Sequence, residues 1–174
     1  MKRRTALKTA PALFSQIALA APWGSAQATQ AAPAAPGQVV VWPDVTLLDG
    51  SRWPATPWAG HAAVVVFWST TCPFCKRHNQ HIEKLYRSTD RNTLAVLGVA
   101  RERDAAAVQR YAQLQGYSFP ITLDHGPLSA ALSTRRMIPL TITVDRQGRL
   151  LQTIPGEMFE EDVMELAQLG AKRA

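Results

Sequence analysis

The chain has 174 residues, of which 47% are hydrophobic and 18% are charged, which suits one folded domain and excludes a disordered chain. Its formal net charge is +6, but Lys2, Arg3, Arg4 and Lys8 all precede the first acidic residue, Asp44. After these four, 15 of the 19 basic residues remain against 13 acidic ones. The rest of the chain therefore lacks the basic stripe of a nucleic-acid-binding protein, and we expect no nucleic-acid partner.

Residues 1–28 have the pattern of a bacterial export signal. A basic start is followed by a mildly apolar stretch at 9–23 and by an Ala-x-Ala cleavage pattern at 26–28. Arg3-Arg4 resembles a twin-arginine signal, although a general secretory signal and an uncleaved leader stay open. The apolar stretch is too short and too broken for a good membrane-spanning helix. We expect a periplasmic protein that meets the membrane only through export or an uncleaved leader, in a compartment that permits disulfides.

The Ala/Pro-rich residues 29–37 are interpreted as a linker, and residues 38–174 as a single domain without repeats. Within this domain, the continuous apolar run at 62–68 predicts a strand buried on both faces. Strands are predicted at 38–42, 45–50, 62–68, 93–100, 119–123, 140–145 and 149–154, and helices from about Cys72 and over 104–116, 127–132 and 160–171. This alternation indicates an α/β sandwich around a mixed sheet.

Both cysteines of the chain, Cys72 and Cys75, form one C-x-x-C motif. Pro73 suits the first helical turn, because its missing N–H costs nothing there. A sulfur at that helix start would face unpaired N–H groups, which favour the thiolate form of Cys72. Cys75, one turn later, would act as the resolving thiol of a redox pair.

Two other uses of the cysteines are considered. The motif continues through His78 and His81, but ligands three residues apart drift by about 60° per step around a helix and cannot converge on one metal. A copper site with both sulfurs and one distant histidine stays open. A structural staple is disfavoured, because so small a loop removes little chain entropy. His61, His81 and His125 are expected to be surface residues rather than ligands.

The segments VVVFWSTTCPFC and MIPLTITVDRQGRLL together resemble the thioredoxin superfamily, and most of all its exported TlpA/ResA/CcmG group. The resemblance covers about residues 44–170. It implies a thioredoxin-like three-layer sandwich with a central mixed sheet flanked by helices. It also implies an N-terminal hairpin and an inserted helix and strand between Ala100 and Asp124.

The resemblance assigns roles to single residues. Cys72 matches the exposed nucleophile, Cys75 the resolving cysteine, and Pro139 a cis-proline that exposes the backbone of the preceding residue to a client chain. For Trp68 core packing is also open, and both roles can hold together. For Pro139 the alternative is an ordinary trans turn. The candidate client-binding residues are Trp68, Pro73, Phe74, Ile138 and Pro139.

Three positions depart from the related proteins. Val66 replaces the buried aspartate of thioredoxin, His78 replaces a glutamate of the ResA-like group, and Thr71 replaces a frequent tryptophan. We hypothesise that His78 accepts the proton of Cys75 or tunes this cysteine, since imidazole trades protons near neutral pH. A solvated helix histidine is the alternative.

The sequence thus predicts an exported thiol–disulfide oxidoreductase that exchanges a dithiol with protein clients and uses no cofactor. The resemblance suggests reduction of a client such as an apocytochrome or a copper-site assembly protein, with electrons from a membrane or periplasmic donor. Lys76 and Arg77 favour an oxidising disulfide and Ile138 a reducing one, so the direction stays open. The alternatives are a copper-handling module and a thiol peroxidase, although Ser69 stands where a peroxidase has threonine.

Overall fold

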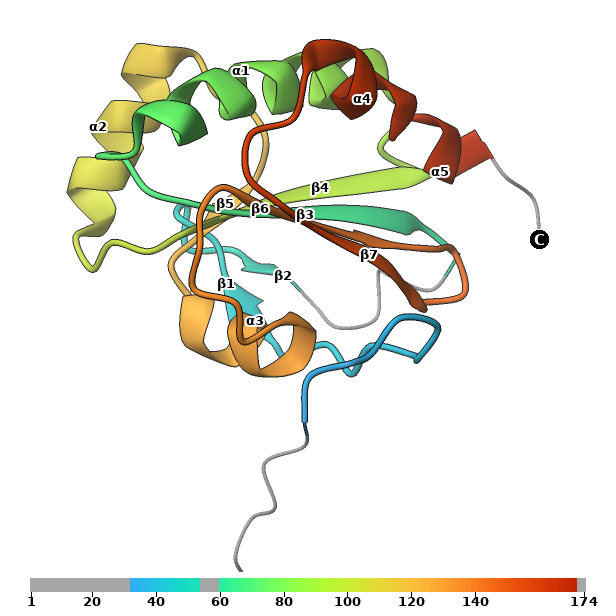
Figure 1. The fold of residues 1–174 in the computed structure, drawn as a ribbon. Coiled ribbons are helices and arrows are strands. Elements are labelled where there is room, and N and C mark those ends of the chain that lie inside the picture. Colours follow the sequence, from blue (N-terminus) through green and yellow to red (C-terminus); the bar gives the residue numbers. More distant parts are fainter. Residues whose placement is uncertain (1–31, 54–59, 172–174) are drawn as a thin grey trace, which may run out of the picture.

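A computed structural model describes residues 32–53 and 60–171 of the chain (Figure 1). The predicted export signal, the first three linker residues and the last three residues of the chain lie outside the described residues. The central sheet has the strand order β5-β4-β3-β6-β7. Its strands are β3 (Ala62–Trp68), β4 (Leu94–Ala100), β5 (Ile121–Thr122), β6 (Leu140–Val144) and β7 (Leu150–Pro155). Because β3, β4 and β5 are parallel while β6 and β7 run antiparallel to their neighbours, the sheet is mixed as predicted.

The strand β3 is buried along its whole length, which explains its unbroken apolar sequence. Its alternate residues enter two separate cores. Val64, Val66 and Trp68 face a core shared with helices on one side, whereas Val65 and Phe67 face a second core on the other. The fold is therefore a three-layer sandwich with the sheet in the middle.

The described helices cover both faces of this sheet (Figure 1). On the face of α1 lie α2, α4 and α5, while α3 and the small N-terminal hairpin cover the other face. The helices are α1 (Pro73–Ser88), α2 (Ala105–Gln115), α3 (His125–Leu132), α4 (Glu160–Glu165) and α5 (Gln168–Ala171). The predicted insertion is confirmed, because α2 and β5 follow β4 and extend the sheet at its edge.

The N-terminal hairpin is also confirmed, with β1 (Val45–Thr46) antiparallel to β2 (Arg52–Trp53). The strand predicted at 38–42 is wrong, since this segment forms only an isolated bridge between Val39 and Arg149. Val39 and Val41 are 58% and 80% exposed, so the valine run does not enter the sheet.

The last predicted helix, 160–171, is interrupted between α4 and α5. Hydrogen bonds over three residues, from Leu166 N–H to the Val163 carbonyl and from Ala167 N–H to the Met164 carbonyl, tighten the chain there. The tighter turn brings Gly170 against Thr93 and Leu94, where an added Cβ would lie 2.9 Å from Thr93 Oγ1.

Candidate active site

The two cysteines lie at the junction between β3 and α1. Cys72 is the N-cap of α1, and its Sγ accepts a hydrogen bond of 3.2 Å from the Cys75 backbone N–H. Pro73 occupies the first turn of the helix, as predicted. The two cysteines form a disulfide with Cα atoms 5.2 Å apart. Cys72 is partly exposed whereas Cys75 is fully buried, so a partner molecule can reach only the first residue of the pair.

The second predicted segment of the site begins β6. The Ile138–Pro139 peptide bond is cis. Leu140 pairs with Phe67, so Pro139 lies beside the end of β3, at the sheet edge from which the chain continues to Cys72. Ile138 is partly exposed at this edge. Fold and register therefore bring the 138–139 segment to the same edge as the cysteines.

Of the remaining client-binding candidates, two are on the surface and one is not. Pro73 is exposed, and Phe74 is 55% exposed with the Arg77 guanidinium 5.1 Å from its ring centre. Trp68 is fully buried, which corrects its assignment as a client-binding residue. Its ring packs 5.8 Å from Tyr111 and 5.9 Å from Tyr117, between centroids. Trp68 is thus part of the aromatic core behind the site.

Gly98 of β4 makes room for this aromatic core. A Cβ at this position would lie 2.6 Å from the ring of Phe119 and 3.1 Å from the indole nitrogen of Trp68. A glycine is therefore required where β4 passes under the two rings.

His78 lies on the inner side of α1 and is fully buried, so it is not a solvated helix histidine. Its Nδ1 accepts a hydrogen bond of 3.3 Å from the Met158 backbone N–H, which leaves the proton on Nε2. Nε2 lies 2.9 Å from the Thr141 hydroxyl and donates to it. The ring thereby ties α1 to β6 and to the loop that precedes α4.

Burial, with a smaller contribution from the charge of His81, lowers the pKa of His78 to about 4, although Glu157 acts in the opposite direction. The imidazole is consequently neutral at pH 7, with both nitrogens engaged. This arrangement favours the tuning role of the hypothesis over proton exchange near neutral pH.

The sequence did not single out Glu102, the second residue after the end of β4. Its Oε1 accepts hydrogen bonds from the Thr70 N–H at 2.6 Å, the Ser69 hydroxyl at 2.7 Å and the Thr70 hydroxyl at 2.9 Å. Burial alone would raise the pKa of Glu102, but these hydrogen bonds outweigh it and lower the pKa below its ordinary value. The carboxylate thus holds the turn that leads into Cys72.

The neighbouring residue, Arg101, holds the other loop of the site. Its guanidinium donates to the backbone carbonyls of Arg135, Arg136 and Met137, and its own N–H donates to the Trp68 carbonyl at 3.0 Å. Arg101 and Glu102 together connect the end of β4 to both loops that frame the cysteines. Their position, two charges directly after a buried strand, is the only signal in the sequence that could have marked them.

The comparisons with known proteins agree with this geometry. The Redoxin family matches residues 35–169. ResA of Halalkalibacterium halodurans, a thiol-disulfide oxidoreductase, is 30% identical over 122 residues, which are 70% of this chain and 69% of the relative.

The chain belongs to the Redoxin family. This family and the cysteine geometry make it a thioredoxin-like thiol-disulfide oxidoreductase, as the sequence predicted.

Solved structures confirm the fold of this Redoxin-family protein. A thioredoxin-family thiol:disulfide interchange protein from Chlorobium tepidum superposes with a TM-score of 0.71 at 20% identity, over 81% of this chain and all (100%) of that chain. A secreted Mycobacterium tuberculosis disulfide oxidoreductase, described as homologous to E. coli DsbE, gives a TM-score of 0.64 at 18% identity, over 72% and 94% of the two chains.

The other histidines in the described residues are His61, His81 and His125. His81 Nε2 lies 3.8 Å from a Glu160 carboxylate oxygen, and His61 and His125 are partly exposed. Across residues 32–53 and 60–171, no group of three or more His, Cys, Asp or Glu side chains could hold a metal ion. No helix in the same ranges is long and apolar enough to cross a membrane.

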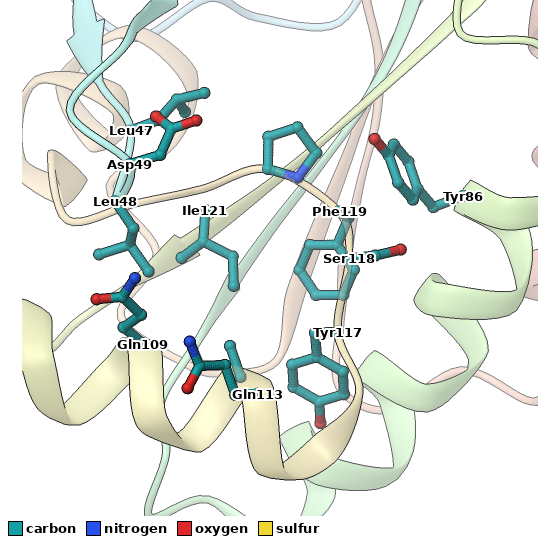
Figure 2. A pocket seen from close by; sticks show the side chains of 12 residues that line it. Leu47, Leu48, Asp49, Tyr86, Gln109, Gln113, Tyr117, Ser118, Phe119 and Ile121 are labelled. Carbon is teal, nitrogen blue, oxygen red and sulfur yellow. The ribbon is translucent and has the colours of Figure 1, made fainter.

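A pocket of about 400 Å³ lies away from the cysteines of this Redoxin-family protein, between the β1–β2 turn, α2 and β5 (Figure 2). Figure 2 shows Gln109 and Gln113 of α2 on one side of it, with Leu48 and Ile121 nearby. Neither cysteine lines this pocket, and neither does the 138–139 segment. The exchange site is therefore the exposed edge around Cys72 and not the pocket.

Proposed function

We propose that this protein is an exported, periplasmic disulfide reductase that exchanges the Cys72–Cys75 dithiol with disulfides of protein clients. The observation that carries the proposal is the asymmetry of the pair. Cys72 is partly exposed at the start of α1, whereas Cys75 is fully buried beneath it. The sulfur of Cys72 can react with a client disulfide, whereas the sulfur of Cys75 can only attack the mixed disulfide that results.

The exchange proceeds in two steps. The thiolate of Cys72 attacks one sulfur of the client disulfide, which forms a mixed disulfide and releases the other client sulfur as a thiolate that takes up a proton. Cys75 then loses its proton, and its thiolate attacks Cys72 Sγ. This closes the Cys72–Cys75 disulfide and releases the second client thiol. Two electrons pass from the protein to the client.

The start of α1 prepares Cys72 for the first step. The Cys75 N–H already donates to Cys72 Sγ, and a thiolate at this place would keep that bond. The first turn of α1 contains no acidic residue that would oppose the negative charge. These features support Cys72 as the nucleophile, with Cys75 as the resolving cysteine.

The client would lie along the edge formed by Pro73, Phe74 and Ile138, next to the buried Pro139. Ile138 is partly exposed beside the end of β3, where its backbone could pair with an extended client segment. We propose that His78 acts through structure, by fixing α1 against β6, and so tunes the environment of Cys75. A membrane or periplasmic dithiol donor would reduce the protein again.

Export rests on the pattern of residues 1–28, and the secreted relative of known structure agrees with it. An oxidising compartment needs a separate source of electrons if this protein works as a reductant. An apocytochrome or a copper-site assembly protein remains the client class that the sequence resemblance suggests.

A redox titration of the full chain in glutathione buffers tests the direction of exchange. We expect a single two-electron transition at a potential below that of the client disulfide. A transition in strongly oxidising buffers would instead make the protein an oxidant. Tight binding of one Cu(I) without disulfide exchange would favour a copper-handling module, and rapid consumption of hydrogen peroxide would favour a peroxidase.

Trapping identifies the clients. In Cys75→Ala the mixed disulfide cannot resolve, so clients from a periplasmic extract should remain covalently attached and be released by dithiothreitol. Cys72→Ala is the matched control and should trap none. Equal trapping by both variants would contradict the proposed roles of the two cysteines.

A further inference from the structure

We propose that a ring of unpaired basic side chains around the cysteines selects client segments that carry aspartate or glutamate beside the target disulfide. This inference rests on the proposed exchange with protein clients and names the class of client. We call this surface the basic rim, and it consists of Lys76, Arg103, Arg135 and Arg136.

Arg135 and Arg136 stand on a loop that is held in place. The Arg101 guanidinium binds the backbone carbonyls of both residues, so their peptide groups turn toward the end of β4. Both residues are exposed. They precede Ile138 by three and two residues, so their charges border the segment that would pair with a client.

Arg103 and Lys76 extend the basic rim on the side of the cysteines. Arg103 directly follows Glu102, which is bound to Thr70 in the turn before Cys72. Lys76 directly follows Cys75, and both of these cations are exposed. The rim therefore flanks the exchange site from the two loops and from α1.

The nearby carboxylates are already engaged. Glu102 accepts three hydrogen bonds from Ser69 and Thr70, and Glu157 is paired with Arg77 at 2.6 Å. Asp104 caps α2 through the Ala107 N–H. Within the described part of the chain, no rim residue forms an ion pair. A client carboxylate would meet cations that have no competing partner.

Apolar side chains stand between these charges. Phe74 and Met137 are 55% and 50% exposed, one beside each loop of the site. A polypeptide can supply a disulfide, an apolar contact and a carboxylate within a few residues, which an anionic lipid surface cannot. The basic rim therefore fits an extended protein segment with an acidic residue next to its cysteine.

Exchange rates with designed peptides test this inference. Three peptides would share one intramolecular disulfide and differ only in flanking residues, which are aspartate and glutamate, serine, or lysine. Stopped-flow measurement with the reduced full chain should give rates about tenfold higher for the acidic peptide than for the lysine peptide at low salt. The difference should vanish at about 1 M salt, where charges are screened within a few ångströms.

Variants locate the effect on the rim. Arg135→Gln with Arg136→Gln should reduce the preference for the acidic peptide to about twofold or less. Arg91→Gln with Arg146→Gln is the matched control, because it removes the same charge from the opposite end of the sheet and should leave the preference unchanged. Equal rates for all three peptides, or a preference that only the control variant reduces, would overturn the inference.

An uncharged disulfide separates this inference from the proposed function. Oxidised mercaptoethanol carries no flanking charge, so its reaction with the reduced wild type measures the cysteine chemistry alone. If it exchanges normally while the peptides show no charge preference, the basic rim alone is refuted. If neither it nor any peptide exchanges, the proposed function fails. Equal peptide rates together with binding to phosphatidylglycerol vesicles would assign the rim to a membrane surface instead.

Discussion

The helices α1 and α2 begin with nearly the same geometry but with different chemistry. Each follows a parallel strand, and the capping residues Cys72 and Asp104 have φ,ψ of −93°, 112° and −92°, 101°. Each cap side chain accepts a hydrogen bond from the N–H three residues on, at Cys75 and at Ala107. In α2 the cap is a carboxylate with no further bond to make, whereas in α1 it is a sulfur that can leave the cap and bond to another sulfur.

The comparison shows that the cap geometry is common to both helices and only the cap atom is reactive. A helix start offers stabilising N–H groups to any acceptor. At α1 the acceptor is also a nucleophile, and its resolving partner lies one turn below. Substitutions at the two cap residues can therefore separate the contribution of a cap to protein stability from its contribution to disulfide exchange.

The largest expected effect is on reactivity at α1. Cys72→Ser keeps a good N-cap, so its free energy of unfolding should stay within about 1 kcal/mol of that of the reduced wild type. Disulfide exchange should be abolished, because the hydroxyl cannot form a mixed disulfide. Chemical denaturation under reducing conditions and an insulin reduction assay measure the two quantities. Residual exchange in this variant would show that Cys75 is accessible after all.

The second largest effect is expected at the sixth residue after each helix cap. This residue is the buried His78 in α1 and the exposed Arg110 in α2. The pKa of His78 is lowered to about 4, so the unfolded chain takes up a proton between about pH 6.5 and 4 that the folded chain does not. Stability is therefore lost as the pH falls through this range. We expect wild type to lose about 3 kcal/mol more than His78→Gln between pH 7 and 4.

Urea denaturation at a series of pH values measures this difference. Arg110→Gln, the change at the corresponding position of α2, is the control and should follow the wild-type curve. Carboxylates whose pKa is lowered in the folded state, such as Glu102, make all three proteins less stable in acid. Only the difference between the stability curves therefore reports on His78. Parallel curves for wild type and His78→Gln would contradict a buried neutral ring.

A smaller effect is expected at Glu102, which stands two residues before the α2 cap and binds the turn before the α1 cap. Glu102→Gln leaves an amide that cannot accept from all three donors with the strength of a carboxylate. We expect a loss of about 1–2 kcal/mol in stability and a slower reaction of Cys72 with an uncharged disulfide. Glu161→Gln, at an exposed position in α4, is the control and should change neither quantity.

The smallest effect is expected at the α2 cap itself. Asp104→Ala removes the hydrogen bond to the Ala107 N–H and should cost about 1 kcal/mol of unfolding free energy. Exchange rates should remain those of wild type, because this cap takes no part in the chemistry. A rate that falls with Asp104→Ala but recovers with Asp104→Ser would show that the α2 start also positions the site.

The sequence predicted what depends on neighbours along the chain. The apolar run of β3 and the proline after Cys72 specify a buried strand and a helix start locally, and the structure has both. Gly116, the last residue of the helix predicted over 104–116, ends α2 in the left-handed conformation, at φ 71°. Such features need no knowledge of the tertiary fold.

The features that the sequence did not reveal depend on distant partners. The partners of Glu102 lie 32 and 33 residues away and the farthest partner of Arg101 lies 36 residues away, so no local pattern in the sequence marks these contacts. His78 stands among polar residues of α1, and its burial is set by Thr141 and Met158. The segment 38–42 has the valine-rich composition of a strand. In the described structure it pairs with a neighbouring segment through only one isolated bridge.

The burial of Cys75 directly beneath Cys72 also bears on oxidative damage. If a peroxide converts the exposed thiolate to a sulfenic acid, the nearest nucleophile is the thiol one turn below. Their condensation releases water and gives the same disulfide that client turnover produces. A second oxidation to the irreversible sulfinic acid would have to outpace this ring closure. Oxidation of Cys72 by peroxide thus leads to the same Cys72–Cys75 disulfide that forms in the catalytic cycle, and the protein can be reduced again from there.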